Sequence, residues 1–583
     1  MIASAPPVAQ ARSRRFDFSG AVFAAALVLV CGLTVFTGLA PMRLLEHDNF
    51  FLLDNAYRVA QGQVPHRDFS SAWGPVIYLA DATGLFLSGM RPAGLAYANA
   101  LFGALIGVWA YRIGRARLVS LSACWMGVYT LLLIAAPFSL GYLPLLFSEA
   151  MVYNRYGFAL LGIILVECGA HALGTGTGAR DQTKGAISSG AAFAILAFLK
   201  VTFAIVAVPF LLLSLVRGPG RNHRLFTLCA ASALVLFLFS CYLRFDFRDL
   251  LQDLAMAANA RGRSWSPGAI PGLAFGKEGM PLVFLVAAVT LAKYTLSEVR
   301  SRETPLADAH GPDRRSPDPS RDREGAMEAR LGSKWPVREL LMALLTLGVG
   351  GALLSSNNQP GTMPLNVFVA LLLADSSLVR LRWGARPGLS TLAVALLLAM
   401  CALPAGMLDA LSVAAAARAS RRPDARAVRL ATERGASMIF APVRSLEITE
   451  TGGPAYVRTL NDGIALLRRH TQAPDGVLTI DMVNPFNYLL GRHSPRGGIA
   501  AGAYNYVFSD AAHLSDDRFF GDARYVLVRK YSRDAGDFAT EQYHIEGLLR
   551  IYRAALDGRF GLLEETPHWQ LYGLRQAAPK RTL

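Results

Sequence analysis

The chain alternates long apolar blocks with short polar segments. Most blocks approach the roughly 20 apolar residues that a helix needs to cross the hydrocarbon core of a bilayer. The pattern therefore predicts a polytopic α-helical membrane protein with about eleven spans. We expect these spans at residues 21–40, 93–113, 118–137, 151–170, two within 186–216, 226–243, 280–296, 337–354, 363–379 and 389–408.

Basic residues gather in alternate segments between the blocks, which is the positive-inside pattern of membrane proteins. On this rule residues 1–20 stay in the cytoplasm and residues 21–40 form a retained first span. Lys200 interrupts the apolar run 186–216, and two short spans hinged there keep both flanking basic loops inside. Residues 297–334 mix both charge signs with Pro, Gly and Ser, which is typical of a disordered cytoplasmic loop.

The longest polar segments fall on the outer side. Residues 42–91 form the first outer loop of the membrane module, which spans residues 21–408. Within that loop, residues 75–89 are moderately apolar and predict a helix lying at the membrane surface. Residues 409–583 follow the last span, beginning with a polar tether near 418–434. Strand patterns such as GVLTID and RYVLVRK then alternate with helical ones, which predicts a small extracytoplasmic α/β domain.

Composition narrows the function classes. The formal net charge is +16, but the Lys and Arg residues sit in short loops and no basic–aromatic platform occurs, so nucleic acid is not an expected partner. All six cysteines fall in apolar blocks without a CxxC pair, which argues against disulfides and a cysteine-based zinc site. Motifs typical of α/β-hydrolases, ATPases and dinucleotide-binding enzymes are absent from the sequence.

The first outer loop is the richest segment in candidate chemistry. It reads EHDNFFLLDNAYRVAQGQVPHRDFSSAWGPVIYLA. Carboxylates at a bilayer surface can act as general bases, and neighbouring arginines can hold a phosphate. A solvated loop with ordinary salt bridges is the alternative interpretation. The charged candidates are Glu46, Asp48, Asp54, Arg58, His66, Arg67 and Asp68.

This loop resembles the first outer loop of the GT-C membrane glycosyltransferases, which include the protein O-mannosyltransferases and the lipid A aminoarabinose transferase group. The alternation of spans and the outer tail extend the resemblance over roughly the whole chain. The matching positions, in the order and at the spacing of the family motif, are Asp48, Ala56, Val59, Gly62, Pro65, Asp68, Phe69, Pro75 and Tyr78.

The resemblance implies an inverting transferase in the bacterial cytoplasmic membrane. Its donor would be a polyprenyl-phosphate sugar, and its acceptor an extracytoplasmic lipid, glycan or protein. Asp48 would be the base that deprotonates the acceptor while the sugar leaves its lipid phosphate. A lipid donor also explains why a transferase would need a membrane and would lack a nucleotide-sugar site.

The sequence departs from the family pattern at two places. The acidic pair is Asp48-Asn49, so Glu46 would have to supply the second acid. Glu46 and Asp48 are also candidate ligands for a divalent metal, although no cofactor is required by the proposed chemistry. At the second place, Trp73-Gly74 stands where the family has a phosphate-binding lysine followed by proline. Candidates for the missing positive charge are Arg58, Arg67, Lys200, Arg261 and Arg263.

Further candidates lie at the mouths of later spans. Glu149 precedes the fourth span, where it is either a second functional acid facing a cavity or an acid favoured by the helix dipole. Asn154 and Arg155 follow it and are expected to line the same cavity, while Asp68 and Tyr78 of the first loop are expected to contact substrate. Lys200 either binds the donor phosphate or extends to the membrane interface.

Two other function classes remain open. A transporter or flippase for a lipid-linked glycan would be expected to show internal symmetry with charges at the bilayer midplane, and no repeat is found. A non-catalytic membrane scaffold would account for the altered motif at Asn49 and Trp73. In the tail, the loop with Arg492, His493 and Arg496 either caps the active site or is a structural turn.

Overall fold

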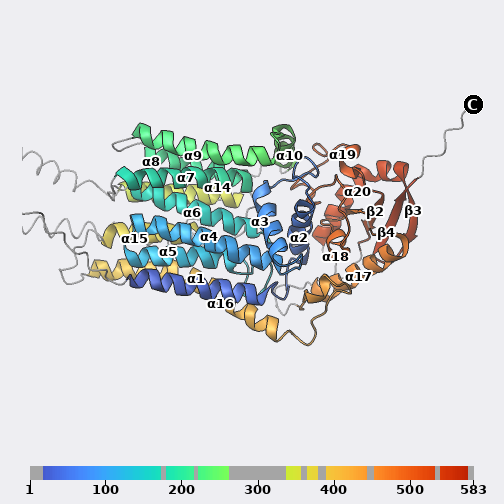
Figure 1. The fold of residues 1–583 in the computed structure, drawn as a ribbon, viewed down its shortest axis with the longest axis horizontal. Helices are drawn as coiled ribbons and strands as arrows, with labels where there is room; N and C mark the ends of the chain where they lie inside the picture. Colours follow the sequence, from blue (N-terminus) through green and yellow to red (C-terminus); the bar gives the residue numbers. More distant parts are fainter. Residues whose placement is uncertain are drawn as a thin grey trace, which may run out of the picture.

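The structure is a computed structural model that describes residues 17–172, 179–215, 221–260, 337–355, 364–378, 389–442, 452–473, 475–531 and 539–575. Long helices lie side by side in a bundle, and the C-terminal segment caps one end of it (Figure 1). The bundle helices are α1 (Phe18–Thr37), α4 (Gly94–Arg117), α5 (Ser120–Ala135), α6 (Val152–Ala172), α7 (Ala179–Leu199), α8 (Val201–Leu215), α9 (Arg221–Tyr242), α14 (Val337–Ser355), α15 (Leu365–Leu378) and α16 (Leu389–Arg421).

These helices fall where the apolar blocks predicted them, and the mainly helical fold is confirmed. Within the described ranges, α1, α4 and α9 are long and apolar enough to cross a membrane. Helices α5 and α8 are apolar but shorter. The predicted span at 280–296 and the loop at 297–334 lie outside the described residues.

The hinge predicted at Lys200 is confirmed as a helix break. Helix α7 ends at Leu199 and α8 begins at Val201. Their far ends lie close to the same ion pair: Glu167 of α6 lies against Gly185 of α7 and pairs with Arg224 of α9. Arg224 also donates to Ser214 near the end of α8 at 3.4 Å. The apolar run is therefore a helical hairpin rather than one long helix.

Two features differ from the sequence predictions. The last bundle helix, α16, does not end at residue 408 but continues to Arg421, so the first residues assigned to the tail and its tether are helical. The extra turns are Ala-rich, and alanine favours helix whether or not the segment is in a membrane. The segment after α9 also contains a helix that was not predicted, α10 (Phe247–Ala260).

Three helices lie between the bundle and the C-terminal unit: α2 (Glu46–Ala60), α3 (Pro75–Leu87) and α10 (Figure 1). Helix α2 is buried on nearly all sides. Helix α3 confirms the helix expected at 75–89 and begins with Pro75, whose fixed φ suits the first helical turn.

The C-terminal unit is built on a four-stranded sheet with the order β1-β2-β4-β3. The predicted strands β1 (Val477–Ile480) and β2 (Tyr525–Arg529) pair in parallel, with Val477 opposite Tyr525. Two strands that were not predicted, β3 (Phe560–Glu565) and β4 (Trp569–Leu574), form an antiparallel hairpin. Its helices are α17 (Gly452–His470), α18 (Phe486–Leu490), α19 (Asp516–Phe520) and α20 (Ala539–Arg559).

Backbone hydrogen bonds attach the C-terminal unit to the first loop. The amide of Met42 donates to the carbonyl of Ile439 at 2.8 Å, and the amide of Ser70 donates to the carbonyl of Gly498 at 3.0 Å. The side chain of Gln61 adds a donor to the carbonyl of Arg492 at 2.8 Å. The tail loop around Arg492 and Arg496 therefore packs against α2 and the segment after it.

Candidate functional site

The first turn of α2 places three charged side chains in sequence. It begins after Leu45, whose φ of 52° turns the chain sharply into the helix. Glu46 is buried, and Asp48 keeps about a quarter of its side chain exposed (24%). The imidazole of His47 lies between two carboxylates, 3.5 Å from Asp48 and 3.5 Å from Glu541 of α20. Acidic groups in a first turn are also favoured by the helix dipole.

Burial and charge act in opposite directions on these groups. Burial raises the pKa of the Asp48 carboxyl, and the charge of His47 partly offsets this. For His47, burial disfavours the charged form, but the carboxylates of Asp48 and Glu541 outweigh it and raise its pKa to about 9. At neutral pH His47 is therefore a cation held against Asp48 by a residue of the C-terminal unit.

Asn49 connects α2 to the loop before α6. Its amide oxygen accepts the backbone N–H of Glu149 at 3.0 Å, and its amide nitrogen donates to Ser148 Oγ at 3.4 Å. A side-chain amide supplies both an acceptor and a donor, which a carboxylate would not. The departure from the family's acidic pair at Asn49 thus has a structural explanation.

Glu149 is buried directly before α6. Its carboxylate accepts a hydrogen bond from Asn99 at 2.9 Å, and Tyr156 donates to the same asparagine at 3.0 Å. Burial raises the pKa of Glu149 to about 7, against the lowering effects of Arg155 and Asn99. Asp81 of α3 is buried and close enough to interact electrostatically with it.

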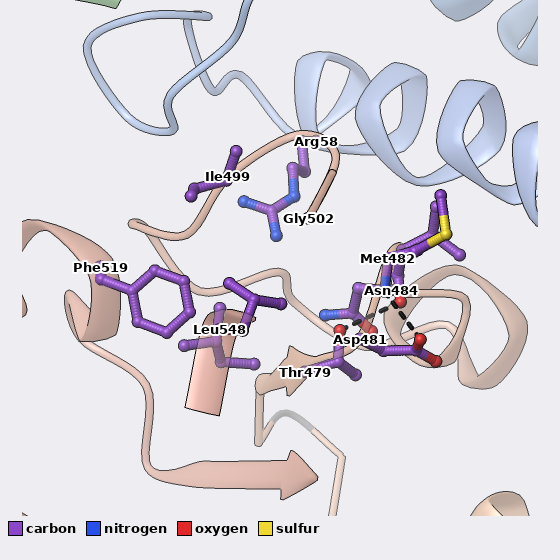
Figure 2. Close-up of a pocket in the computed structure, with 11 residues that line it drawn as sticks. Arg58, Thr479, Asp481, Met482, Asn484, Ile499, Gly502, Phe519 and Leu548 are labelled. Atoms are coloured by element: carbon purple, nitrogen blue, oxygen red, sulfur yellow. Dashed lines mark hydrogen bonds between the residues drawn. The ribbon is translucent and has the colours of Figure 1, made fainter. Parts of the chain in front are cut away.

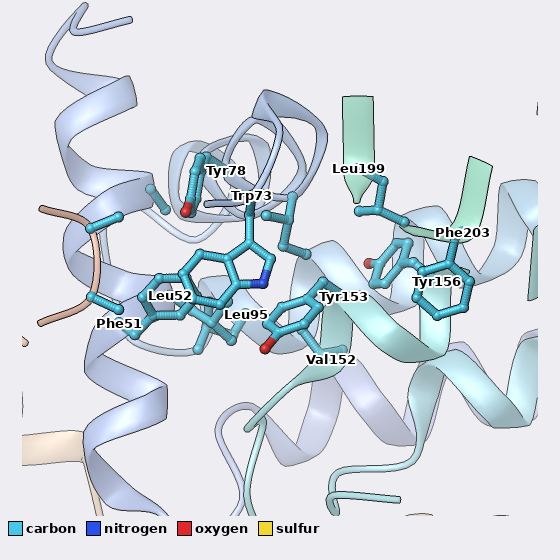
Figure 3. Close-up of a cluster of buried hydrophobic side chains, with 14 of the residues drawn as sticks. Phe51, Leu52, Trp73, Tyr78, Leu95, Val152, Tyr153, Tyr156, Leu199 and Phe203 are labelled. Atoms are coloured by element: carbon cyan, nitrogen blue, oxygen red, sulfur yellow. The ribbon is translucent and has the colours of Figure 1, made fainter. Parts of the chain in front are cut away.

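The hinge between α7 and α8 brings Lys200 into this part of the molecule. Its ammonium donates to the Asn154 amide oxygen at 3.2 Å and lies 5.0 Å from the centre of the Tyr153 ring. The indole of Trp73 packs on the same tyrosine at 5.5 Å, and its N–H is buried without a hydrogen-bond partner among the described residues. Figure 3 shows Trp73 between Phe51 and Tyr153.

The segment that departs from the family motif is in direct contact with the hinge. The amide of Gly74 donates to the carbonyl of Leu199 at 3.2 Å. A Cβ on Gly74 would lie 1.9 Å from the carbonyl oxygen of Phe198, so only glycine fits here. A proline at position 74 would lose both the donor and the space. Trp73 and Gly74 therefore belong to one packed arrangement with Lys200.

The remaining sequence-predicted residues have protein partners at other places. Arg58 is buried against Asp54 at 3.0 Å and donates to the carbonyl of Gly497 at 3.0 Å. Arg67 pairs with its neighbour Asp68 at 2.5 Å.

Two further sequence-predicted residues lie in the bundle helix α6 (Arg155) and in α3 (Tyr78). Arg155 donates to the Leu133 carbonyl at 2.7 Å and pairs with Asp409 at 3.2 Å. Tyr78 is buried in the aromatic cluster with its hydroxyl 2.8 Å from Ser71 Oγ. The predicted residues Arg261 and Arg263 lie outside the described residues.

A buried carboxylate beside the first loop was not among the sequence-predicted residues. Asp253 of α10 is fully buried and contacts His66 at 3.0 Å and Ser70 at 2.8 Å. Arg518 of the C-terminal unit reaches it at 3.3 Å. These partners are distant in sequence, so no local motif points to them.

The interface between α2 and the C-terminal unit encloses a small pocket of about 10 Å³, close to the room that one water needs. Arg58 reaches toward it from α2, while Asp481 and Asn484 line it from the loop after β1 (Figure 2). Across the parts of the chain that the structure describes, no three His, Cys, Asp or Glu side chains are arranged to hold a metal ion.

No known family profile and no curated protein matches the sequence. Among solved structures, the chain is similar to ArnT from Cupriavidus metallidurans bound to undecaprenyl phosphate, at 12% identity and a TM-score of 0.41 over 95% of this chain and 97% of that chain. The apo state of that protein is similar at 11% identity and a TM-score of 0.38, over 95% and 98%. An Archaeoglobus fulgidus oligosaccharyltransferase in complex with Zn and sulfate is similar at 12% identity and a TM-score of 0.32, over 87% and 68%.

Proposed function

We propose that the chain is a membrane glycosyltransferase that moves a sugar from a polyprenyl-phosphate donor to an extracytoplasmic acceptor. Asp48 is the proposed base. It takes the proton of the acceptor hydroxyl or amine while the acceptor atom attacks the anomeric carbon. The bond from that carbon to the phosphate oxygen breaks, and the electron pair leaves with the lipid phosphate. This single displacement inverts the anomeric centre and needs no covalent intermediate.

The observation that carries the proposal is the packing of Trp73-Gly74 on the hinge at Lys200. The family motif places a lysine at position 73, where this chain has none. The contact of Gly74 with Leu199 is next to Lys200 in the chain. The Lys200 ammonium and the Trp73 indole both contact the ring of Tyr153. We assign the donor phosphate to this place, with the Lys200 ammonium and the Trp73 N–H as donors.

Two acids divide the remaining work in this proposal. Asp48 is partly exposed and has a cationic neighbour in His47, so it is suited to be ionised and to meet an acceptor from outside. Glu149 is enclosed and bonded to Asn99, so we assign it the orientation of the site rather than proton transfer. Asn49 joins the two acids, because it follows Asp48 in the chain and its side-chain oxygen accepts the backbone N–H of Glu149.

Donor binding to variants of Lys200 tests this assignment. In nanodiscs, a polyprenyl phosphate should raise the unfolding temperature of the wild type. Lys200→Met should weaken that binding about tenfold or more, because a charge-assisted contact is lost. Lys200→Arg keeps the charge and should retain part of the binding.

A matched lysine controls for general effects of losing a cation. Lys530 directly follows β2 in the C-terminal unit, far from the hinge in the sequence, and forms an exposed ion pair with Glu565. Lys530→Met should bind the lipid as the wild type does. If Lys200→Met elutes as a monodisperse protein and binds the lipid unchanged, the phosphate assignment is wrong.

A further inference from the structure

Helix α10 and the turn before it carry acidic side chains on one face and exposed apolar and basic side chains on the other. Asp246, Asp249 and Asp253 recur at a spacing that places them on one side of a helix. Asp253 contacts His66, and Asp249 lies 3.8 Å from Arg518. Asp246 accepts the backbone N–H of Asp249 at 3.4 Å, at the beginning of the helix. Asp249 and Asp253 therefore form contacts with the C-terminal unit and the first loop.

The opposite face is apolar and basic. Phe245, Phe247 and Leu251 are 56%, 40% and 63% exposed. Arg244 and Arg248 are exposed beside them, and neither side chain has an ion pair or hydrogen bond with another described residue. Large exposed apolar side chains next to exposed arginines, on a helix and the turn that leads into it, are typical of a surface that meets the boundary of a bilayer.

This face continues the exposed surface of a bundle helix. Helix α9 is one of the helices long and apolar enough to cross a membrane. Its exposed Phe237 lies 6.1 Å from Phe245, which in turn lies 6.5 Å from Phe247. Arg244 and Phe245 have φ values of 56° and 59°, which make the sharp turn from α9 into α10. One run of aromatic rings thus leads from the span onto α10.

We propose that α10 lies at the headgroup level of the bilayer, in the leaflet on the side of the C-terminal unit. Phe245, Phe247 and Leu251 reach the upper acyl chains, and Arg244 and Arg248 bind phospholipid phosphates. Asp253 connects this lipid-facing helix to Ser70 in the first loop. The membrane surface thereby fixes the height of that loop.

Three exposed leucines allow a direct test in nanodiscs. With all six cysteines replaced, a nitroxide is attached at Leu251→Cys, at Leu234→Cys in α9, or at Leu562→Cys in β3. These positions are similarly exposed, at 63%, 61% and 51%. Collision rates with oxygen, which concentrates in lipid, and with a water-soluble nickel complex are then compared. Leu251 should give an oxygen-to-nickel ratio between those of the other two sites.

The arginines are tested in the same background. Arg244→Glu with Arg248→Glu should raise nickel access at position 251 at least twofold, while Arg524→Glu on the C-terminal unit should leave it unchanged. Labels at 234 and 562 report whether the fold is kept. A ratio at 251 equal to that at 562 would remove the membrane contact, and one equal to that at 234 would place α10 in the hydrocarbon core. Unchanged access after the charge reversal would remove the phosphate contact.

Discussion

At the scale of single residues, His47 joins the proposed base to the C-terminal unit. It lies between Asp48 and Glu541, and its pKa is raised from 6.5 to about 9. A group whose pKa is raised on folding stabilises the folded state fully below its unfolded pKa. That contribution is lost as the pH rises toward and through the folded pKa. The window for His47 therefore runs from about pH 6.5 to about pH 9.

Glu541→Gln should lower the upper limit of the pH range over which the charge of His47 stabilises the folded state. Removing one carboxylate lowers the pKa of His47, so the loss of stability on raising the pH should begin at lower pH than in the wild type. Activity should fall on the alkaline side over the same interval, because Asp48 loses its cationic neighbour. Unfolding temperature and initial rate, each measured from pH 6 to pH 10, check this. Glu546→Gln, on the same helix, is the control, and superimposable profiles for Glu541→Gln and wild type would refute the linkage.

Gly74 tests the packing of the altered motif on the hinge. Gly74→Ala would place a Cβ within 1.9 Å of the Phe198 carbonyl, so either the loop or the hinge must move. Overpacking of this kind costs about 1–3 kcal/mol. The variant should unfold at lower temperature and bind polyprenyl phosphate more weakly. Gly32→Ala in α1 meets nothing within 4 Å and should be neutral or stabilising. Equal behaviour of the two variants would mean that the contact does not matter.

The sequence located some of these residues but not their partners. Asp48, Glu149 and Lys200 stand out in the sequence because a charged side chain beside an apolar block has a high free-energy cost in lipid unless it faces a partner or a cavity. The partners of His47 and Asp253 come from α20 and α19, hundreds of residues away in the chain. One sequence without contacts contains no local signal for such pairs.

At the scale of elements, one buried ion triad fastens three bundle helices together. Glu167 of α6 accepts from Arg117 of α4 at 2.6 Å and from Arg224 of α9 at 2.9 Å. All three side chains are buried. The helices in this region cannot separate without exposing one of these charges to an apolar surrounding.

Glu167→Gln should therefore destabilise the bundle strongly, because it leaves two buried arginines without their carboxylate. Breaking a buried pair in this way costs about 3–5 kcal/mol. Glu564 is the matched control, since its pairs with Arg469 and His470 are at the surface. Glu564→Gln should cost at most about 1 kcal/mol. Thermal unfolding in detergent compares the two, and similar losses would show that the triad is not a fastening point.

Helix positions in the bundle followed from hydrophobic blocks because burial and lipid contact both demand apolar residues. The break at Lys200 was predictable for the same reason, since an ammonium interrupts such a block. Helix α10 was not, because its acids and arginines alternate with apolar residues and the segment looks polar. Strand β3 was missed because two of its leucines, Leu562 and Leu563, are exposed and a bulge disturbs the alternation.

At the scale of the whole molecule, the C-terminal unit and the bundle enclose α2 between them. The first turn of α2 carries the proposed base. The residues beside that base have partners on both sides: His47 pairs with Glu541 of the C-terminal unit, and Asn49 accepts the backbone N–H of Glu149 in the loop before α6. Backbone bonds at Met42 and Ser70 hold this arrangement. The proposed site is thus complete only when the two halves of the chain are assembled.

The proposed function is sugar transfer from a lipid phosphate with Asp48 as the base. The most direct measurement follows release of free polyprenyl phosphate from a panel of polyprenyl-phosphate sugars by the protein in nanodiscs with acceptor present. Wild type and the control Asp557→Asn, at an exposed ion pair, should release it from at least one donor. Asp48→Asn should be slower by about 100-fold or more while folding normally. Release by Asp48→Asn at the wild-type rate would remove Asp48 as the base, and silence of well-folded wild type across the panel would contradict the transferase itself.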